Sequence, residues 1–261
     1  MFDSAVSGTE KTFGDAWSLY SEIIPLHRQQ FLGWIQPIDL AFFKGKRFLD
    51  AGCGIGRNSL WPLEAGAASA YAFDFDERTV AIARENLKSF PNCAVGFESI
   101  YDFKRENDFD VAFCIGVLHH LADPRKAVEN LLRAVKPGGT LILWVYAYEG
   151  NESYLAWANP VRAWLTSKLH PRIVQQIARA LTLLLKFYLL FPQRNRYMRF
   201  LKERSFRHME AMVFDQLIPT ISLYYRQQQV IELVEGLPVE IKHLVHSYDV
   251  SWTLVVEKHR R

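Results

Sequence analysis

Short apolar runs alternate with amphipathic stretches through the middle of this 261-residue chain. The runs have the length of β-strands, and the stretches between them repeat apolar residues every three or four positions, as helices do. Such repeated units predict a parallel sheet with right-handed crossovers and helices on both faces. We expect strands near residues 47–51, 70–74, 93–98, 110–116 and 139–146, and helices near 57–66, 77–89 and 124–136.

Residues at the segment boundaries support this assignment. Asp76 fits the N-cap of the second helix, and Asp123 fits an N-cap followed by Pro124 at the first helical position. Pro137-Gly138-Gly139 is expected to end the third helix and turn the chain into the fifth strand.

The alternation breaks on either side of this region. Residues 1–45 predict an amphipathic helix, followed by a helical stretch over Leu32 to Phe43 that Pro37 interrupts. The apolar positions of the first helix are Phe13, Trp17, Tyr20, Ile23 and Ile24, and a packed face is the ordinary interpretation of such a set.

Residues 147–235 predict long helices, including Ile177–Phe191. Arg179 and Lys186 interrupt that helix, so its apolar pieces are far shorter than the 18 or so residues that span a bilayer. Val239–Val245 and Ser251–Glu257 then predict two strands in a closing antiparallel hairpin.

A glycine-rich turn follows the first strand, in the sequence Leu49-Asp50-Ala51-Gly52-Cys53-Gly54-Ile55-Gly56. Glycines at alternate positions allow a tight turn and bring bare backbone close to a ligand. Asp74 ends the next strand, 22 positions after Gly52, near the spacing of about 20 that places a carboxylate on ribose hydroxyls. Asp74 could instead cap the following helix, but Asp76 already fits that role.

These motifs resemble the class I S-adenosylmethionine-dependent methyltransferases, in particular the type 11/12-like group. The resemblance covers roughly residues 46 to 146 and rests on four motifs in the family's order. They are the glycine-rich turn, Ala72-Phe73-Asp74-Phe75-Asp76, the run from Phe109 to Leu121 that ends in Gly116-Val117-Leu118-His119-His120-Leu121, and Val135-Lys136-Pro137-Gly138-Gly139.

The resemblance implies an α/β fold with a Rossmann-like doubly wound seven-stranded sheet, mostly parallel with an antiparallel last strand, and a helical insertion after the fifth strand. It divides the chain into an N-terminal helical lid (1–45), a cofactor-binding core (46–146), a helical substrate lobe (147–235) and a final hairpin that completes the sheet (236–261).

The implied cofactor is S-adenosyl-L-methionine. Asp50 would hold the glycine turn or accept from the ammonium group, Asp74 would accept from the ribose hydroxyls, and Ser99 and Ile100 would lie at the adenine edge. Many family members carry an acid at that edge; here backbone groups or Asp102 would replace it. The expected cofactor-binding residues are Asp50, Gly52, Cys53, Gly54, Gly56, Asp74, Phe75, Ser99, Ile100, Ile115 and Gly116.

His119 and His120 follow the fourth strand and are the candidates for a base or an orienting group at the acceptor, with bracing of the loop as the alternative. Metal-assisted quinone-precursor O-methyltransferases resemble Glu-x-x-Glu-His at this point. This chain lacks those carboxylates, so no metal is expected. The expected substrate-binding residues are Trp17, Tyr146, Tyr148 and Glu149, with Tyr224, Tyr225, His208, Asp215, His246 and Tyr248 as weaker candidates.

Charge is distributed unevenly. The net charge is +3, but residues 151–210 carry eleven Lys or Arg against three acids, while the rest of the chain is slightly acidic. An ordinary solvated lobe, contact with an anionic membrane surface or acidic substrate, and RNA binding all remain open, with nucleic acid the least favoured. Three scattered cysteines and the absence of a secretory signal pattern predict a cytoplasmic protein.

The sequence therefore predicts an S-adenosylmethionine-dependent methyltransferase whose acceptor is a small molecule, acidic or lipid-linked. A tRNA-modifying methyl- or carboxymethyltransferase is an alternative. A non-catalytic cofactor-binding module that regulates a partner is another, because binding and turnover share the same residues.

Overall fold

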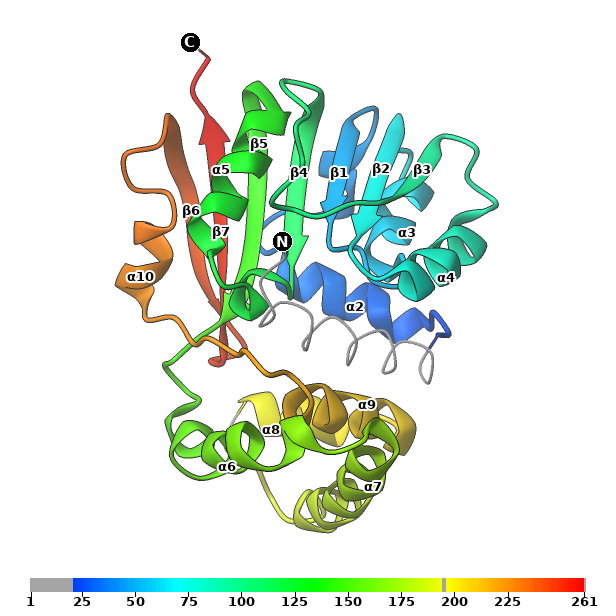
Figure 1. The fold of residues 1–261 in the computed structure, drawn as a ribbon, viewed down its shortest axis with the longest axis vertical. Coiled ribbons are helices and arrows are strands. Elements are labelled where there is room, and N and C mark those ends of the chain that lie inside the picture. Colours follow the sequence, from blue (N-terminus) through cyan, green and yellow to red (C-terminus); the bar gives the residue numbers. More distant parts are fainter. Residues whose placement is uncertain (1–20, 194–195, 261) are drawn as a thin grey trace.

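The computed structural model describes residues 21–193 and 196–260 and contains a single seven-stranded sheet within them (Figure 1). The strand order is β3-β2-β1-β4-β5-β7-β6, and β7 runs antiparallel to both of its neighbours while the others are parallel. This topology confirms the predicted fold class. The strands are β1 (Arg47–Ala51), β2 (Ser69–Asp74), β3 (Cys93–Phe97), β4 (Phe109–Ile115), β5 (Val135–Tyr146), β6 (Val239–Ser247) and β7 (Ser251–Lys258).

Successive residues of the central strands face opposite layers, and both layers are apolar. Phe48 belongs to one buried cluster and Leu49 to the other, and Val111 and Ala112 divide in the same way. Strands buried on both faces read as continuous apolar runs, which explains why the sequence pattern marks them clearly.

Helices cover the two faces. One layer contains α2 (Pro25–Trp34), the 3₁₀ helix η1 (Leu40–Phe43), α3 (Arg57–Glu64) and α4 (Glu77–Leu87). The other contains the 3₁₀ helix η2 (Leu118–His120), α5 (Pro124–Ala134) and α10 (Gln227–Glu232). The predicted caps are confirmed: the Asp76 carboxylate accepts from the Arg78 and Thr79 amides, and the Asp123 carboxylate accepts from the Lys126 amide.

A helical lobe lies beyond the carboxyl ends of the strands (Figure 1). It consists of α6 (Glu152–Trp164), η3 (Thr166–Lys168), α7 (Pro171–Tyr188), α8 (Arg196–Lys202) and α9 (Phe206–Leu217). Val174 and Ala178 of α7 pack against Phe214 of α9 in a core separate from those of the sheet. The lobe thus has its own apolar interior.

The chain enters and leaves the lobe side by side. Ala147 and Tyr225 form a parallel bridge, in which the Tyr225 amide donates to the Tyr146 carbonyl and the Tyr148 amide donates to the Tyr225 carbonyl, both at 2.9 Å. After this bridge the chain returns to the sheet, where Val230 and Val234 join its core. The expected lobe extends to residue 235, whereas α10 packs on β7 rather than on the lobe helices.

Two sequence predictions differ from the structure. The stretch Leu32–Phe43 contains the end of α2, a turn at Pro37 and η1, because α2 starts early, with Pro25 at its first position. The fifth strand starts at Val135 instead of 139, because Val135 already pairs with Phe109. The register then shifts, with Thr140 opposite Val111, so the Pro-Gly-Gly segment forms extra residues on β5 at an irregularity of the ladder. The first predicted helix falls mainly on residues 1–20, outside the described residues.

Candidate active site

A cavity of about 820 Å³ separates the carboxyl ends of β1, β2, β4 and β5 from the lobe. Ligands of open α/β sheets bind at this end of the strands. Its volume lies near the top of the roughly 300–1,000 Å³ usual for ligand pockets. Both a cofactor and a small acceptor therefore have room. Aromatic residues of the lobe and its return segment form the wall opposite the sheet: Tyr154, Tyr188, Tyr197, Phe200 and Tyr224.

The glycine turn forms one wall of the cavity. Gly52 and Gly54 have φ angles of +76° and +54°, which favour glycine. A Cβ on Gly52 would lie 2.3 Å from the Val117 Cγ2 atom, and the Gly52 and Cys53 amides both donate to the Phe73 carbonyl at 2.9 Å. The turn is thus fixed to β2 with its backbone bare. Gly56 lies away from the cavity, where a Cβ would lie 2.8 Å from a Leu87 methyl carbon.

Asp74 lies at the end of β2 and lines the same cavity. Its Oδ2 accepts from the Gly54 amide at 2.9 Å and its Oδ1 accepts from the Asp76 amide at 3.1 Å. Burial raises the pKa of this carboxyl, while the amide donors lower it. A carboxylate has about four acceptor sites, so Asp74 retains acceptor capacity beyond these two amides.

Asp50 does not line the cavity and is almost fully buried. Ser59 in α3 donates to its Oδ2 at 2.7 Å, and burial raises its pKa to about 7. Of the two roles weighed from the sequence, this geometry favours holding the turn and α3 over contact with an ammonium group.

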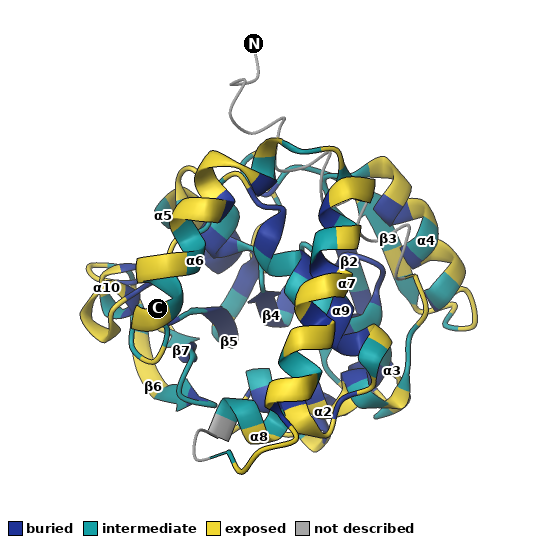
Figure 2. Ribbon diagram, turned by 90° about the horizontal axis from the view of Figure 1, so that it is seen from below, coloured by how far each residue is buried: buried dark blue, intermediate teal, exposed yellow. Residues whose placement is uncertain are grey.

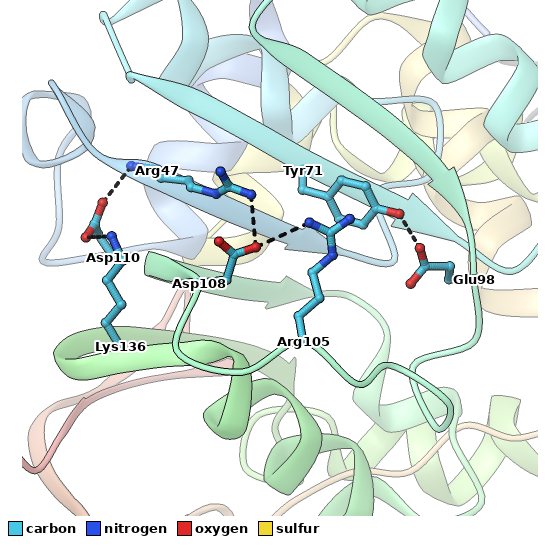
Figure 3. Close-up of polar contacts among 7 residues, drawn as sticks. All are labelled: Arg47, Tyr71, Glu98, Arg105, Asp108, Asp110 and Lys136. Atoms are coloured by element: carbon cyan, nitrogen blue, oxygen red, sulfur yellow. Dashed lines mark hydrogen bonds and ion pairs between the residues drawn. The ribbon is translucent and has the colours of Figure 1, made fainter. Parts of the chain in front are cut away.

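The next wall carries Phe75, Ser99 and Ile100, all of which line the cavity. Glu98 lines it too, although the sequence reasoning missed this acid beside Ser99 and named Asp102, which does not line it. The Tyr71 hydroxyl donates to the Glu98 carboxylate (Figure 3). An acid is therefore available at the expected adenine edge.

Ile115 is the last residue of β4 and Gly116 follows it; both line the cavity. The φ angle of Gly116 is +80°, and its amide donates to the Trp144 carbonyl at 3.3 Å. Gly116 and Gly52 both flank Val117, so this segment presents backbone and small apolar groups to the cavity.

The two adjacent histidines have different environments. His119 is fully buried against His120 and Tyr146 and does not line the cavity. Neither of its ring nitrogens has a hydrogen-bond partner among the residues that the structure describes. His120 lines the cavity, and its Nδ1 lies 2.7 Å from the Ile221 carbonyl oxygen. Because a carbonyl can only accept, Nδ1 carries the proton and Nε2 has the lone pair in the neutral ring. Burial lowers the pKa of His120 to about 4.

The expected substrate residues divide similarly. Tyr146 lines the cavity, accepts from the Gln216 Nε2 atom at 2.9 Å and stacks on Tyr224. Tyr148 and Glu149 lie outside the cavity: the Arg226 guanidinium covers the Tyr148 ring, and the Trp252 indole donates to Glu149. Trp17 lies outside the described residues. Of the weaker candidates, the cavity includes His208, Asp215, Tyr224 and Tyr248 but not Tyr225 or His246.

Arg57 is a site residue that the sequence reasoning missed. It is the first residue of α3 and lines the cavity opposite the lobe. Burial lowers its pKa and raises that of Asp215 in α9 to about 6, while attraction between the two charges opposes both shifts. Its position directly after the glycine turn was the available signal.

Comparison with known proteins adds to this geometry. Residues 49–143 match the family described as "Methyltransferase domain". The match identifies residues 49–143 as a methyltransferase domain. This match and the fold confirm the class I resemblance, and the family implies S-adenosylmethionine as cofactor.

The chain is also similar to two curated proteins. It is 35% identical over 134 residues to the ubiquinone biosynthesis O-methyltransferase of Pseudomonas aeruginosa strain LESB58, covering 49% of this chain and 56% of that protein. It is 33% identical over 117 residues to the tRNA U34 carboxymethyltransferase of Idiomarina loihiensis, covering 42% and 35%. The chain thus spans about half and one third of these relatives' lengths.

Among solved structures, the magnesium protoporphyrin IX methyltransferase of Synechocystis PCC 6803 with bound SAH has a TM-score of 0.58 at 15% identity, over 97% of both chains. This similarity concerns the fold. The cofactor's fit is supported here by the bare turn at Gly52 and Gly54 and by the Asp74 carboxylate beside it. In the described parts of the chain, no group of three or more His, Cys, Asp or Glu side chains is arranged to hold a metal ion, and no helix has the length and hydropathy needed to cross a bilayer.

Proposed function

We propose that the protein transfers a methyl group from S-adenosylmethionine to a small, largely apolar acceptor held between the sheet and the helical lobe. The observation that carries this proposal is the shared cavity, in which Gly52 and Asp74 lie on one side and Tyr154 and Tyr224 on the other. The similarity to a ubiquinone biosynthesis O-methyltransferase supports a small-molecule acceptor.

The lining also supports an acceptor with an acidic group. Arg57 carries the positive charge nearest the glycine turn, and Asp215 balances it from the lobe. Partial burial strengthens any interaction of that guanidinium with an anion. The apolar part of the acceptor would lie against the lobe's aromatic rings.

S-adenosylmethionine supplies a methyl group already activated on a sulfonium, so the chain's task is to position the acceptor and exclude water. The turn and Asp74 hold the nucleoside end, and the lobe closes the cavity on the acceptor's side. If the acceptor is a hydroxyl or an amine, its proton must leave as the new bond forms. His120 can accept that proton at Nε2.

His120→Asn tests this role. The Asn amide can replace Nδ1 as the donor to the Ile221 carbonyl but cannot act as a base, so we expect kcat to fall by about 10²–10⁴-fold with cofactor affinity unchanged. His119→Phe is the control: it removes two unpartnered ring nitrogens and leaves kcat near wild type, with stability unchanged or raised. An unaltered kcat in His120→Asn rejects His120 as the base.

Product detection tests the function as a whole. Purified protein, cell extract and labelled S-adenosylmethionine are combined, and metabolites that gain a methyl mass are sought, with Gly54→Arg as the inactive control because its side chain fills the turn. Tight cofactor binding without product from any extract fraction would support the non-catalytic module instead.

The similarity to a tRNA U34 carboxymethyltransferase supports the alternative that the protein acts on tRNA. Binding of tRNA through basic residues would weaken steeply with salt, so titrations at low and raised salt examine it directly. We expect no measurable tRNA binding at low salt, because the candidate site is a cavity rather than an open basic groove.

A further inference from the structure

Exposed apolar side chains are concentrated in one part of the described molecule. Of its fifteen exposed large hydrophobic residues, twelve lie between Trp157 and Phe191, in α6, α7 and the turns that follow them. Trp157 is 81% exposed, Trp164 79% and Phe187 65%. Such a concentration of exposed apolar side chains in one segment is typical of an interaction surface.

Helix α7 is apolar on two separate faces. Val174, Ala178 and Thr182 are buried at spacings of four, facing α9. Ile173, Leu184 and Phe187 project from the opposite side and are exposed. The second face has no partner among the described residues, so packing within the lobe does not account for it.

Helix α6 repeats the pattern. Trp157, Val161 and Trp164 recur at spacings of four and three, which places them on one side of the helix, and all are exposed. Both helices lie on the side of the lobe away from the sheet (Figure 1), and the view from that side shows exposed turns along each (Figure 2). We call this surface the outer face of the lobe.

The charge of this segment has one sign. Between Trp157 and Phe191 there are five Lys or Arg residues and no Asp or Glu. Lys168, Arg172 and Arg179 are exposed, and the Lys168 ammonium lies 5.7 Å from the Trp164 ring centroid. Tryptophan beside lysine and arginine suits the headgroup region of a membrane, where anionic lipid attracts each basic residue.

We propose that the outer face of the lobe docks on the surface of an anionic lipid bilayer. The lobe would lie on the membrane, with the apolar side chains at the headgroup–acyl boundary and the basic residues on phosphates. Tyr188 belongs both to the outer face and to the cavity lining. If the proposed function holds, docking also brings one wall of the acceptor cavity to the bilayer.

Vesicle flotation tests the proposal without measuring methyl transfer. The full chain is mixed with phosphatidylcholine vesicles that contain or lack phosphatidylglycerol, and floated protein is measured at low and high salt. We expect the protein to float with the anionic vesicles, and to float less with neutral vesicles or at high salt. Protein that stays in the bottom fraction with anionic vesicles overturns the proposal.

Matched variants locate the surface. Trp164→Ser with Phe187→Ser removes two exposed rings and should lower vesicle affinity by roughly tenfold or more. Ile241→Ser removes an exposed apolar side chain on β6 and should leave it unchanged. Thermal unfolding and cofactor affinity confirm that each variant is folded. Equal vesicle binding by the double variant and the wild type would show that the outer face is not the docking surface. A wild-type dimer that becomes monomeric in the double variant would show that the outer face binds a second copy of the chain instead, and would also overturn the proposal.

Discussion

The two ends of the sheet hold their carboxylates in opposite ways. At the carboxyl ends of β1 and β2, Asp50 and Asp74 are desolvated, and burial raises both pKa values. Asp50 accepts a hydrogen bond from the Ser59 hydroxyl, and Asp74 accepts from backbone amides. At the amino ends, Asp108 and Asp110 are partly exposed and paired with Arg or Lys side chains (Figure 3). There the Lys136 ammonium and the Arg47 amide lower the pKa of Asp110 despite some burial.

This difference distinguishes carboxylates at the ligand-binding end of the sheet from carboxylates that contribute only to the stability of the fold. Exposed ion pairs contribute about 0–1 kcal/mol each and are screened by salt. A buried carboxylate held mainly by backbone amides destabilises the folded chain in its charged form, so the presence of Asp74 at the cavity favours a binding role for it. Asp50 lies outside the cavity and supports the turn through Ser59.

The clearest contrast between the two ends is expected in cofactor affinity. Asp74→Ala removes the carboxylate between the turn and the cavity, and should weaken S-adenosylmethionine binding by about 10- to 100-fold in calorimetric titration. Asp110→Ala removes a carboxylate from the other end of the sheet and should leave affinity unchanged. Equal affinities for both variants would show that Asp74 does not hold the ribose.

A second contrast is the effect of pH on the free energy of unfolding through Asp50. Its pKa is about 7 in the folded chain against an ordinary value of 3.8, so the folded state binds the proton more tightly and its stability falls as pH rises from about 4 to 7. Asp50→Asn keeps an acceptor for Ser59 without the charge.

We therefore expect Asp50→Asn and wild type to have similar unfolding free energies near pH 4. Toward pH 8 the variant should become more stable by a few kcal/mol. Denaturant unfolding at pH 4, 6 and 8 measures this difference, and a difference that does not change with pH would contradict the assignment.

The smallest effect is expected at the amino ends. Asp108→Asn breaks pairs with Arg47 and Arg105, at 2.9 and 3.2 Å, whose side chains are all about one third or more exposed. We expect the free energy of unfolding to fall by no more than about 1 kcal/mol in low salt, and by less in high salt. A loss of several kcal/mol, unaffected by salt, would remove the distinction between the two ends.

Local patterns made most of the fold predictable. Strands buried on both faces appear as apolar runs, and Asp76 and Asp123 mark helix starts within a few residues of themselves. The bulge at the start of β5 depends on pairing with β4, and the start of α2 depends on a segment with weak periodicity, so neither followed from local sequence.

In the candidate site, too, residues in local motifs were predictable from the sequence, and residues brought in by tertiary packing were not. Gly52 and Asp74 follow from a local motif and line the cavity, but their binding of the cofactor stays a prediction. Asp215 interacts electrostatically with Arg57 from a helix far along the chain. Tyr148 and Glu149 lie outside the cavity, against Arg226 and Trp252 of later segments. Such juxtapositions are set by tertiary packing rather than by spacing.

Because Ala147 and Tyr225 form a bridge, the segments that enter and leave the lobe lie next to each other. Its incoming and outgoing segments meet at the rim of the sheet, so a different set of helices could be grafted between them without moving the cofactor pocket. Exchange of the helical lobe would then change the acceptor specificity while the sheet and the cofactor pocket stay the same.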